Sequence, residues 1–206
     1  MHINWLGQTC VKLQTKNLRD EDVVILIDAY KPKVGDFPRS FSPQIALFSD
    51  GRENAATLSQ DPFVVDTLGE FEVKDAVIYA LPATDGKIIF KFNIENLSVV
   101  HLGRTTKKLA AETIGTIGNV DILLISTGNG DEYLSAEDAA ETVTALEPKI
   151  VIPLGHRCDT DPKAGPITDF IKNMGLKPEA TEKKIIIKKK DLPQEETKLF
   201  VLEKNY

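Results

Sequence analysis

The sequence predicts a layered α/β fold, in which sheets are covered by helices, and three observations point to it. The apolar residues gather in runs of about five, such as Val23-Val24-Ile25-Leu26-Ile27, which is the length of a buried strand. The first half of the 206 residues consists mainly of such runs, separated by turn residues. In the second half, strand patterns alternate with helix patterns, which is typical of sheets that carry helices on their faces.

The first half is expected to be mainly β. Strands are predicted over residues 3–6, 9–13, 23–27, 45–48, 63–66, 71–73, 77–81, 87–94 and 97–102, the last two forming a hairpin that turns at Glu95-Asn96. Pro32, Pro38 and Pro43 predict a loop over residues 31–43, because proline cannot continue a helix or donate to a ladder. Residues 55–60 are predicted to form one or two helical turns.

The second half is expected to alternate. Helices are predicted over 107–117, 135–146 and 167–174, and strands over 121–126 and 149–154. Ser135, followed by Asp138, is typical of a helix start. A closing pair of strands is expected over 184–189 and 198–202, around the acidic loop 191–196. The five lysines of residues 183–190 favour an edge strand protected by charge, with a phosphate or nucleic-acid contact as the alternative.

Composition excludes several classes of protein. The apolar share is 42%, so disorder is not the main state, and no run approaches the roughly 18 apolar residues that cross a membrane. The net charge of −6 disfavours non-specific nucleic-acid binding. Cys10 and Cys158 form no disulfide framework, and the first residues lack the pattern of a signal peptide. We therefore expect one cytoplasmic domain over residues 1–206.

Five segments in order carry a resemblance to a known family. They are Trp5-Leu6-Gly7-Gln8-Thr9-Cys10, Ile25-Leu26-Ile27-Asp28, residues 67–73, His101-Leu102-Gly103 and residues 121–156. Together they resemble the metallo-β-lactamase superfamily, in particular its small branch related to the ascorbate-phosphate lactonases. The resemblance covers residues 3–160 and implies a four-layer αββα sandwich. It also implies zinc or manganese ions that activate a water molecule for hydrolysis.

The metal motif of that family is missing from this sequence. The family motif His-x-His-x-Asp-His follows a strand, and its four ligand positions here hold Asp50, Arg52, Asn54 and Ala55. Arginine has no lone pair to offer and alanine has no ligand atom. The aspartate by which the family bridges two metal ions is replaced by Arg104. Two fixed positive charges therefore stand where a dication would sit.

Two histidines of the family pattern remain. His101 and His156, together with Asp50, are the residues from which an altered metal site would be built. The alternative is that both histidines are structural, held by hydrogen bonds at strand ends. Asp28 is expected to be a structural carboxylate on the floor of the former active site, where it binds backbone amides.

Three arginines form a second group of candidates. The resemblance implies that Arg52, Arg104 and Arg157 lie on loops around the mouth of the former site. Guanidinium groups grip carboxylate or phosphate through two parallel hydrogen bonds, so the three predict an anion site. The alternative is that each arginine pairs with a local acid, for which the candidates are Asp50, Glu53 and Asp159.

Two weaker motifs complete the candidates. Gly128-Asn129-Gly130 matches no nucleotide-binding pattern and is interpreted as a plain turn rather than a phosphate loop. Cys10 and Cys158 are candidate nucleophiles, and Cys158 lies beside Arg157, which favours a thiolate. A nucleophilic cysteine also needs a base placed next to it in space.

The sequence thus favours a metal-free member of the family that has lost hydrolase activity. It would act as a binding, regulatory or scaffold protein, without a cofactor, on a small anionic ligand or a protein partner. One alternative is a zinc- or manganese-dependent hydrolase with an altered site of Asp50, His101 and His156. The other is a binder of anions or phosphates that uses Arg52 and Arg104.

Overall fold

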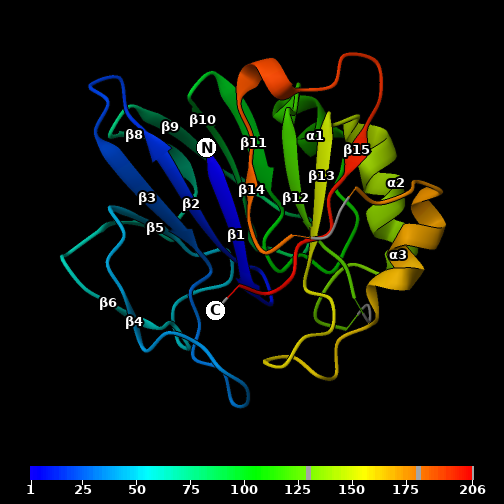
Figure 1. The fold of residues 1–206 in the computed structure, drawn as a ribbon, viewed down its shortest axis with the longest axis horizontal. Coiled ribbons are helices and arrows are strands. Elements are labelled where there is room, and N and C mark those ends of the chain that lie inside the picture. The colour runs from blue at the N-terminus through cyan, green and yellow to red at the C-terminus, as the bar shows by residue number, and fades with distance from the viewer. Residues whose placement is uncertain (129–130, 180–181, 206) are drawn as a thin grey trace.

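Two β-sheets lie face to face and enclose the main core (Figure 1). The computed structural model describes residues 1–128, 131–179 and 182–205. One sheet contains β1 (His2–Gly7), β2 (Cys10–Lys16), β3 (Asp22–Ile27), β5 (Ile45–Leu47), β7 (Phe63–Val65) and β14 (Ile185–Ile186). The other contains β8 (Gly69–Val73), β9 (Ala76–Pro82), β10 (Ile88–Ile94), β11 (Leu97–His101), β12 (Ile122–Ser126), β13 (Ile150–Leu154) and β15 (Lys198–Leu199).

The order of the strands brings several strand ends to one edge. The first sheet runs β14-β1-β2-β3-β5-β7, and the second runs β15-β13-β12-β11-β10-β9-β8. β3 is parallel to β5, and β11, β12 and β13 are parallel to one another. Side chains that follow these strands therefore meet at the carboxyl ends of both sheets. Trp5, Phe90 and Phe92 are fully buried in the core between the sheets.

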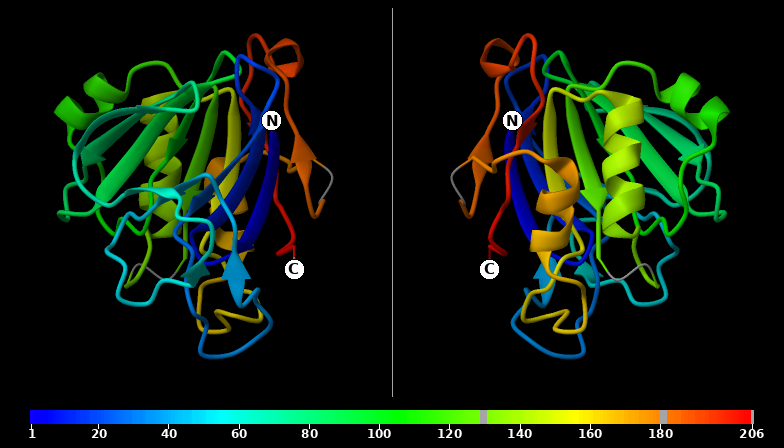
Figure 2. Two further views of the ribbon diagram at one scale, coloured as in Figure 1. Left: turned by 90° about the vertical axis from the view of Figure 1, so that its left-hand side faces the viewer. Right: turned by 90° about the vertical axis from the view of Figure 1, so that its right-hand side faces the viewer.

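Helices cover the outer face of the second sheet. They are α1 (Ala111–Ile117), α2 (Ala136–Leu146) and α3 (Ile167–Met174), and they share a second core with β10 to β13 (Figure 2). As predicted, the Ser135 hydroxyl accepts a hydrogen bond from the Asp138 amide at 3.0 Å and caps α2. The prediction that α1 begins at residue 107 is wrong. The hydroxyl groups of Thr84 and Thr105 donate to the carbonyls of Lys108 and Lys107, and residues 107–110 form a bend and irregular chain before α1.

A loop layer covers the outer face of the first sheet. It includes the short parallel pair β4 (Ser40–Phe41) and β6 (Thr57–Leu58), and its aromatic side chains share a third core with that face. The helical turns predicted over residues 55–60 are therefore wrong. The Ser59 amide donates to the Phe41 carbonyl, so this backbone is used in pairing. Part of the outer face of β1 and β2 stays open, because no helix lies on it among the described residues.

The two closing strands belong to different sheets, so the prediction that they pair with each other is wrong. β14 lies antiparallel to β1, and β15 lies parallel to β13. The 3-10 turn η1 (Lys189–Asp191) and Leu192, which is buried in the main core, carry the chain from one sheet to the other. Burial of Ile185 and Leu199 against these two open edges decides the pairing. β14 is an edge strand, as the lysines around it predict.

Within the described ranges, no helix combines the length and apolar character needed to span a membrane.

Candidate functional site

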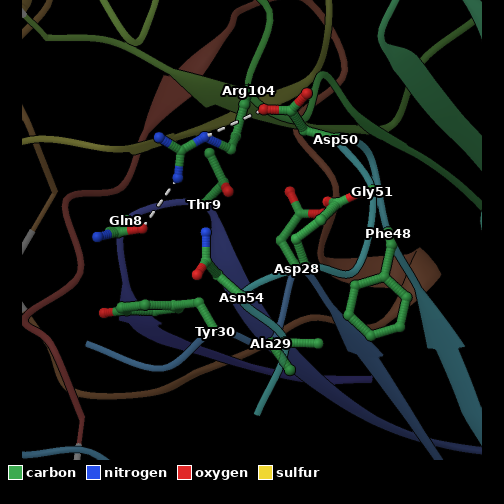
Figure 3. A pocket seen from close by; sticks show the side chains of 12 residues that line it. Gln8, Thr9, Asp28, Ala29, Tyr30, Phe48, Asp50, Gly51, Asn54 and Arg104 are labelled. Carbon is green, nitrogen blue, oxygen red and sulfur yellow. Dashed lines mark hydrogen bonds and ion pairs between the residues drawn. The ribbon is translucent and has the colours of Figure 1, made fainter. Parts of the chain in front are cut away.

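A pocket of about 200 Å³ opens at the carboxyl ends of β3 and β5, and we call it the strand-end pocket (Figure 3). Its wall also includes the turn between β1 and β2 and the loop that follows β5. Its charged and amide side chains are Gln8, Asp28, Asp50, Glu53, Asn54 and Arg104. Three carboxylates and one guanidinium thus line the hollow.

Asp28 forms the floor of the strand-end pocket. It directly follows β3, adopts a left-handed backbone with φ of 51°, and is 9% exposed. Asparagine and aspartate tolerate that conformation better than most residues. Its Oδ1 accepts the Ser49 amide at 2.7 Å, and its Oδ2 accepts the Ser49 hydroxyl at 2.7 Å. The predicted structural role of this carboxylate is confirmed, because it ties the end of β3 to the end of β5.

The turn after β11 approaches the end of β5 very closely. Gly103 has a φ of 62°, and a Cβ placed on it would lie 2.3 Å from the Cβ of Ser49. Only glycine fits this position without moving the strand ends. The next residue, Arg104, donates its amide to the Ser49 hydroxyl at 3.2 Å. Ser49 therefore fixes both the floor carboxylate and the residue that carries the guanidinium.

The Arg104 guanidinium extends along the wall of the strand-end pocket (Figure 3). Its Nη1 donates to Gln8 at 3.0 Å and its Nη2 to Glu132 at 2.5 Å. Its Nε lies 3.7 Å from the Asp50 carboxylate, which is also 3.7 Å from the Lys87 ammonium. Its central carbon lies 5.6 Å from the centre of the Tyr133 ring. The residue that follows Gly103 is thus a cation, and neighbouring side chains hold it on three sides.

His101 uses both of its ring nitrogens within the fold. Its Nε2 lies 2.9 Å from the Thr9 carbonyl, and its Nδ1 accepts the Gly103 amide at 3.0 Å. Since a carbonyl can only accept and an amide only donate, the ring is neutral with its proton on Nε2. Burial lowers the pKa of this fully buried ring, which favours the same neutral form. No lone pair is left for a metal ion.

His156 lies apart from the strand-end pocket. Its ring packs against Trp5 with the ring centres 4.1 Å apart, and the residue is 7% exposed. Burial lowers its pKa from 6.5 to about 4. Its Nε2 has no hydrogen-bond partner among the described residues, and the same holds for the Ser126 hydroxyl at the end of β12.

The remaining donors do not fit a zinc or manganese site. Asp50 lines the strand-end pocket but faces two cations, while His101 is fully bonded and His156 is not part of the lining. Asn54 also lines the pocket, and Ala55 beside it has no ligand atom. Among the described residues, no three His, Cys, Asp or Glu side chains gather in a way that could hold a metal ion.

The three predicted arginines point to different places. Arg104 lines the strand-end pocket, whereas Arg52 forms an ion pair with Asp66 at 2.9 Å. The Arg157 Nε donates to the Ala164 carbonyl at 3.2 Å. Of the described residues that line the pocket, Arg104 is the only arginine.

The two cysteines also lie in different surroundings. Cys10 is fully buried, and burial, with a further contribution from Asp28, raises the pKa of its thiol well above the usual value. Cys158 is half-buried, and its Sγ lies 3.3 Å from the Thr160 hydroxyl.

The turn predicted at residues 128–130 is described only in part. Residues 129 and 130 lie outside the described ranges, and Gly128 lies against Tyr133.

Sequence reasoning missed four residues that build the site: Gln8, Ser49, Glu132 and Tyr133. Ser49 and Gln8 carried a signal, since one directly follows a buried strand and the other lies in the turn of a strand pair. Glu132 carried none, because it lies 28 residues from Arg104 in the sequence and meets it only through the fold.

Solved structures with the same fold include several bacterial and archaeal proteins. A Thermotoga maritima protein of the metallo-β-lactamase superfamily, described as a candidate zinc-dependent hydrolase, is 23% identical, with a TM-score of 0.79 and 98% of each chain covered. Igni18, a metallo hydrolase from Ignicoccus hospitalis, is 16% identical, with a TM-score of 0.59 over 84% of this chain and 90% of its own. YhfI from Bacillus subtilis, a metallo-β-lactamase fold protein, is 6% identical, with a TM-score of 0.61 over 100% of this chain and 97% of its own. No curated protein matches the chain.

The sequence also matches a family model over most of its length. That model describes a beta-lactamase superfamily domain and matches residues 2–155. The mixed α/β fold with two facing sheets agrees with the match, and the fold predicted from the five sequence segments is confirmed. The strand-end pocket departs from the family's metal motif at the positions described above. The chain therefore belongs to the beta-lactamase superfamily.

Proposed function

We propose that this chain works without a metal ion, as a binding or regulatory protein rather than a hydrolase. The observation that carries the proposal is the Arg104 guanidinium, which lies in the strand-end pocket and is held by Gln8, Asp50 and Glu132. A fixed positive charge in that place repels a dication, and the acids that would attract the dication already pair with cations. In this proposal, the chain keeps the fold of a hydrolase family but does not carry out the metal-dependent chemistry of that family.

The altered-hydrolase alternative is supported less well. It needs Asp50, His101 and His156 to act as ligands of one ion. His101 has no free nitrogen, and His156 packs under Trp5 outside the lining of the pocket. Both rings would have to give up their present packing before they could bind a metal.

The anion-binding alternative has one supporting residue in this pocket. Arg104 is available there, but its outer nitrogens donate to Gln8 and Glu132. Asp28, Asp50 and Glu53 share the lining, and their charge opposes an incoming anion. The pocket therefore favours a small polar ligand that offers donors as well as acceptors over a simple anion.

The proposal is tested by putting the family's ligands back. The variant combines Asp50→His, Arg52→His, Asn54→Asp, Ala55→His and Arg104→Asp, and equilibrium dialysis against zinc compares it with the unmodified chain. We expect the unmodified chain to bind no stoichiometric zinc and the variant to gain it, because the missing donors are restored and the repulsive charge is removed.

A second measurement keeps the test independent of how well the variant folds. Thermal unfolding of the unmodified chain is followed with a chelator and with excess zinc or manganese. A ligand that binds the native state raises the unfolding temperature, so we expect the same midpoint in all three conditions. A midpoint that rises with metal and falls with chelator would overturn the proposal.

A further inference from the structure

A second hollow lies on the outer face of the first sheet, and we call it the lysine groove. It has a volume of about 670 Å³ and runs over β1 and β2, between the β4 segment and the residues that precede β14. In Figure 1, β14 lies beside β1 and the C-terminal segment passes near the same strands. The groove exists because a loop layer, rather than a helix, covers this face. It shares no lining residue with the strand-end pocket.

The charges in the lysine groove are all positive. Lys12 reaches it from β2, and Lys183 and Lys184 reach it from the segment before β14. Among the residues that the structure describes, no acidic side chain lines it, and none of these three lysines forms an ion pair. The chain as a whole carries a net charge of −6, so acids are plentiful elsewhere. Like charges gathered in one hollow repel one another unless an anion joins them.

The amide side chain of Asn4 provides a second observation. Asn4 lines the lysine groove and is 7% exposed as a whole residue, but its amide is not among the described buried polar groups that lack a partner, so its polar atoms stay open to the groove. The amide thus offers the groove two N–H donors and one carbonyl acceptor. Asn4 therefore marks the place where a polar atom of a ligand would be bound.

The other lining residues indicate the kind of ligand. Gln14 and Ser40 add hydrogen-bonding groups, while Leu6 and the half-buried ring of Phe41 form an apolar part of the wall. The volume lies within the range of roughly 300–1,000 Å³ that is usual for sites of small molecules. Lysine binds phosphate as a point charge, and three of them suit more than one phosphate group.

We infer that the lysine groove binds a phosphorylated small molecule of nucleotide size, with its phosphates at Lys12, Lys183 and Lys184. Asn4 supplies a hydrogen bond, and the apolar wall receives the uncharged part of the ligand. This site does not depend on the proposed function of the strand-end pocket, because the two hollows have no residue in common.

The test uses isothermal titration of the full chain with ATP and with inorganic pyrophosphate, in buffer that contains a chelator. We expect saturable binding that weakens as salt rises. Lys12→Glu or Lys184→Glu should weaken it about tenfold or more, because a charge-assisted contact is lost and a repulsive charge is introduced. Lys172→Glu, on the exposed side of α3, makes the same change in net charge and should leave binding unchanged.

Any of the following results would overturn the inference. Absence of saturable binding for both probes would do so, and so would equal binding by the Lys12→Glu and Lys172→Glu variants. Tighter binding of a hexaglutamate peptide than of ATP would assign the groove to an acidic protein segment. Equal affinity for ATP and pyrophosphate would contradict the role of the apolar wall. Asn4→Leu keeps the size of the side chain and should weaken ATP binding with little change in thermal stability.

Discussion

The strand-end pocket and the lysine groove differ in how their charges are satisfied. In the strand-end pocket, Asp28 accepts two hydrogen bonds from Ser49, and Arg104 contacts three neighbouring side chains. In the lysine groove, three ammonium groups and the Asn4 amide have no partner within the described residues. The charged groups of the strand-end pocket are thus held by neighbouring side chains. A site whose groups lack partners is one that points to a ligand.

The largest expected effect concerns His156, which lies outside the strand-end pocket. The imidazole is neutral and buried, with a pKa of about 4 against an unfolded value near 6.5. Above pH 6.5 its contribution to stability is complete. As pH falls from 6.5 to 4, His156 becomes protonated in the unfolded chain but stays neutral in the folded chain. The free energy of unfolding therefore falls by about 3 kcal/mol. Urea unfolding at a series of pH values measures this loss.

The matched comparison is the His156→Gln variant, which cannot titrate at this position. The difference in unfolding free energy between the two proteins should shrink as pH falls through that window. A constant difference across pH 7 to 4 would show that the buried ring does not oppose protonation.

The next effect concerns the floor of the strand-end pocket. Asp28→Asn keeps the shape of the side chain and its tolerance of the left-handed backbone, but it sets an amide group against two donors of Ser49. We expect the free energy of unfolding to fall by about 2 kcal/mol. Chemical denaturation measures it, and Ser49→Ala, which removes only the hydroxyl, should cost less. An unchanged stability in Asp28→Asn would mean that the Asp28 carboxylate does not stabilise the contact between the ends of β3 and β5.

A smaller effect is expected for the guanidinium in the pocket wall. Arg104→Ala removes contacts with Gln8, Asp50 and Glu132, and because the group is partly exposed we expect a loss of about 1 kcal/mol. Arg52→Ala breaks one exposed pair with Asp66 and should cost less. Thermal unfolding at low and high salt compares the two. Equal losses in both variants would remove the distinction between a built network and a surface pair.

The smallest effect should have the opposite sign. Lys183→Gln and Lys184→Gln relieve repulsion without breaking a pair, so we expect no loss and a gain of up to about 0.5 kcal/mol. Lys189→Gln, close by in the sequence, breaks a 2.8 Å pair with Asp121 and should lose stability. Melting temperatures at low salt separate the two directions. A loss in Lys183→Gln as large as that in Lys189→Gln would contradict the unpaired state of the groove.

Local patterns predicted most of the fold. Buried strands such as β3 and β12 consist of unbroken apolar runs, and the start of α2 follows from its capping serine. The failures came where pairing partners lie far apart in the sequence. Residues 57–58 have a short helical pattern but pair with β4, and the two closing strands choose different sheets.

The same limit applies to the sites. The loss of the metal motif could be seen at Arg52, Ala55 and Arg104, because it concerns residue types at aligned positions. The partners of Arg52 and Arg157 could not be predicted from the sequence, since a long side chain pairs with whichever acid or carbonyl the fold brings near it. The lysine groove was hidden for the same reason, because Lys12 and Lys183 lie at opposite ends of the sequence.

The most direct test of the account is the metal content of the unmodified protein. The chain would be prepared without a histidine tag, offered excess zinc and manganese, dialysed, and measured by inductively coupled plasma mass spectrometry. We expect no stoichiometric metal, since Arg104 and Lys87 lie beside Asp50 and both ring nitrogens of His101 are hydrogen-bonded. One ion held per chain, and lost in Asp50→Ala or His156→Ala, would contradict it.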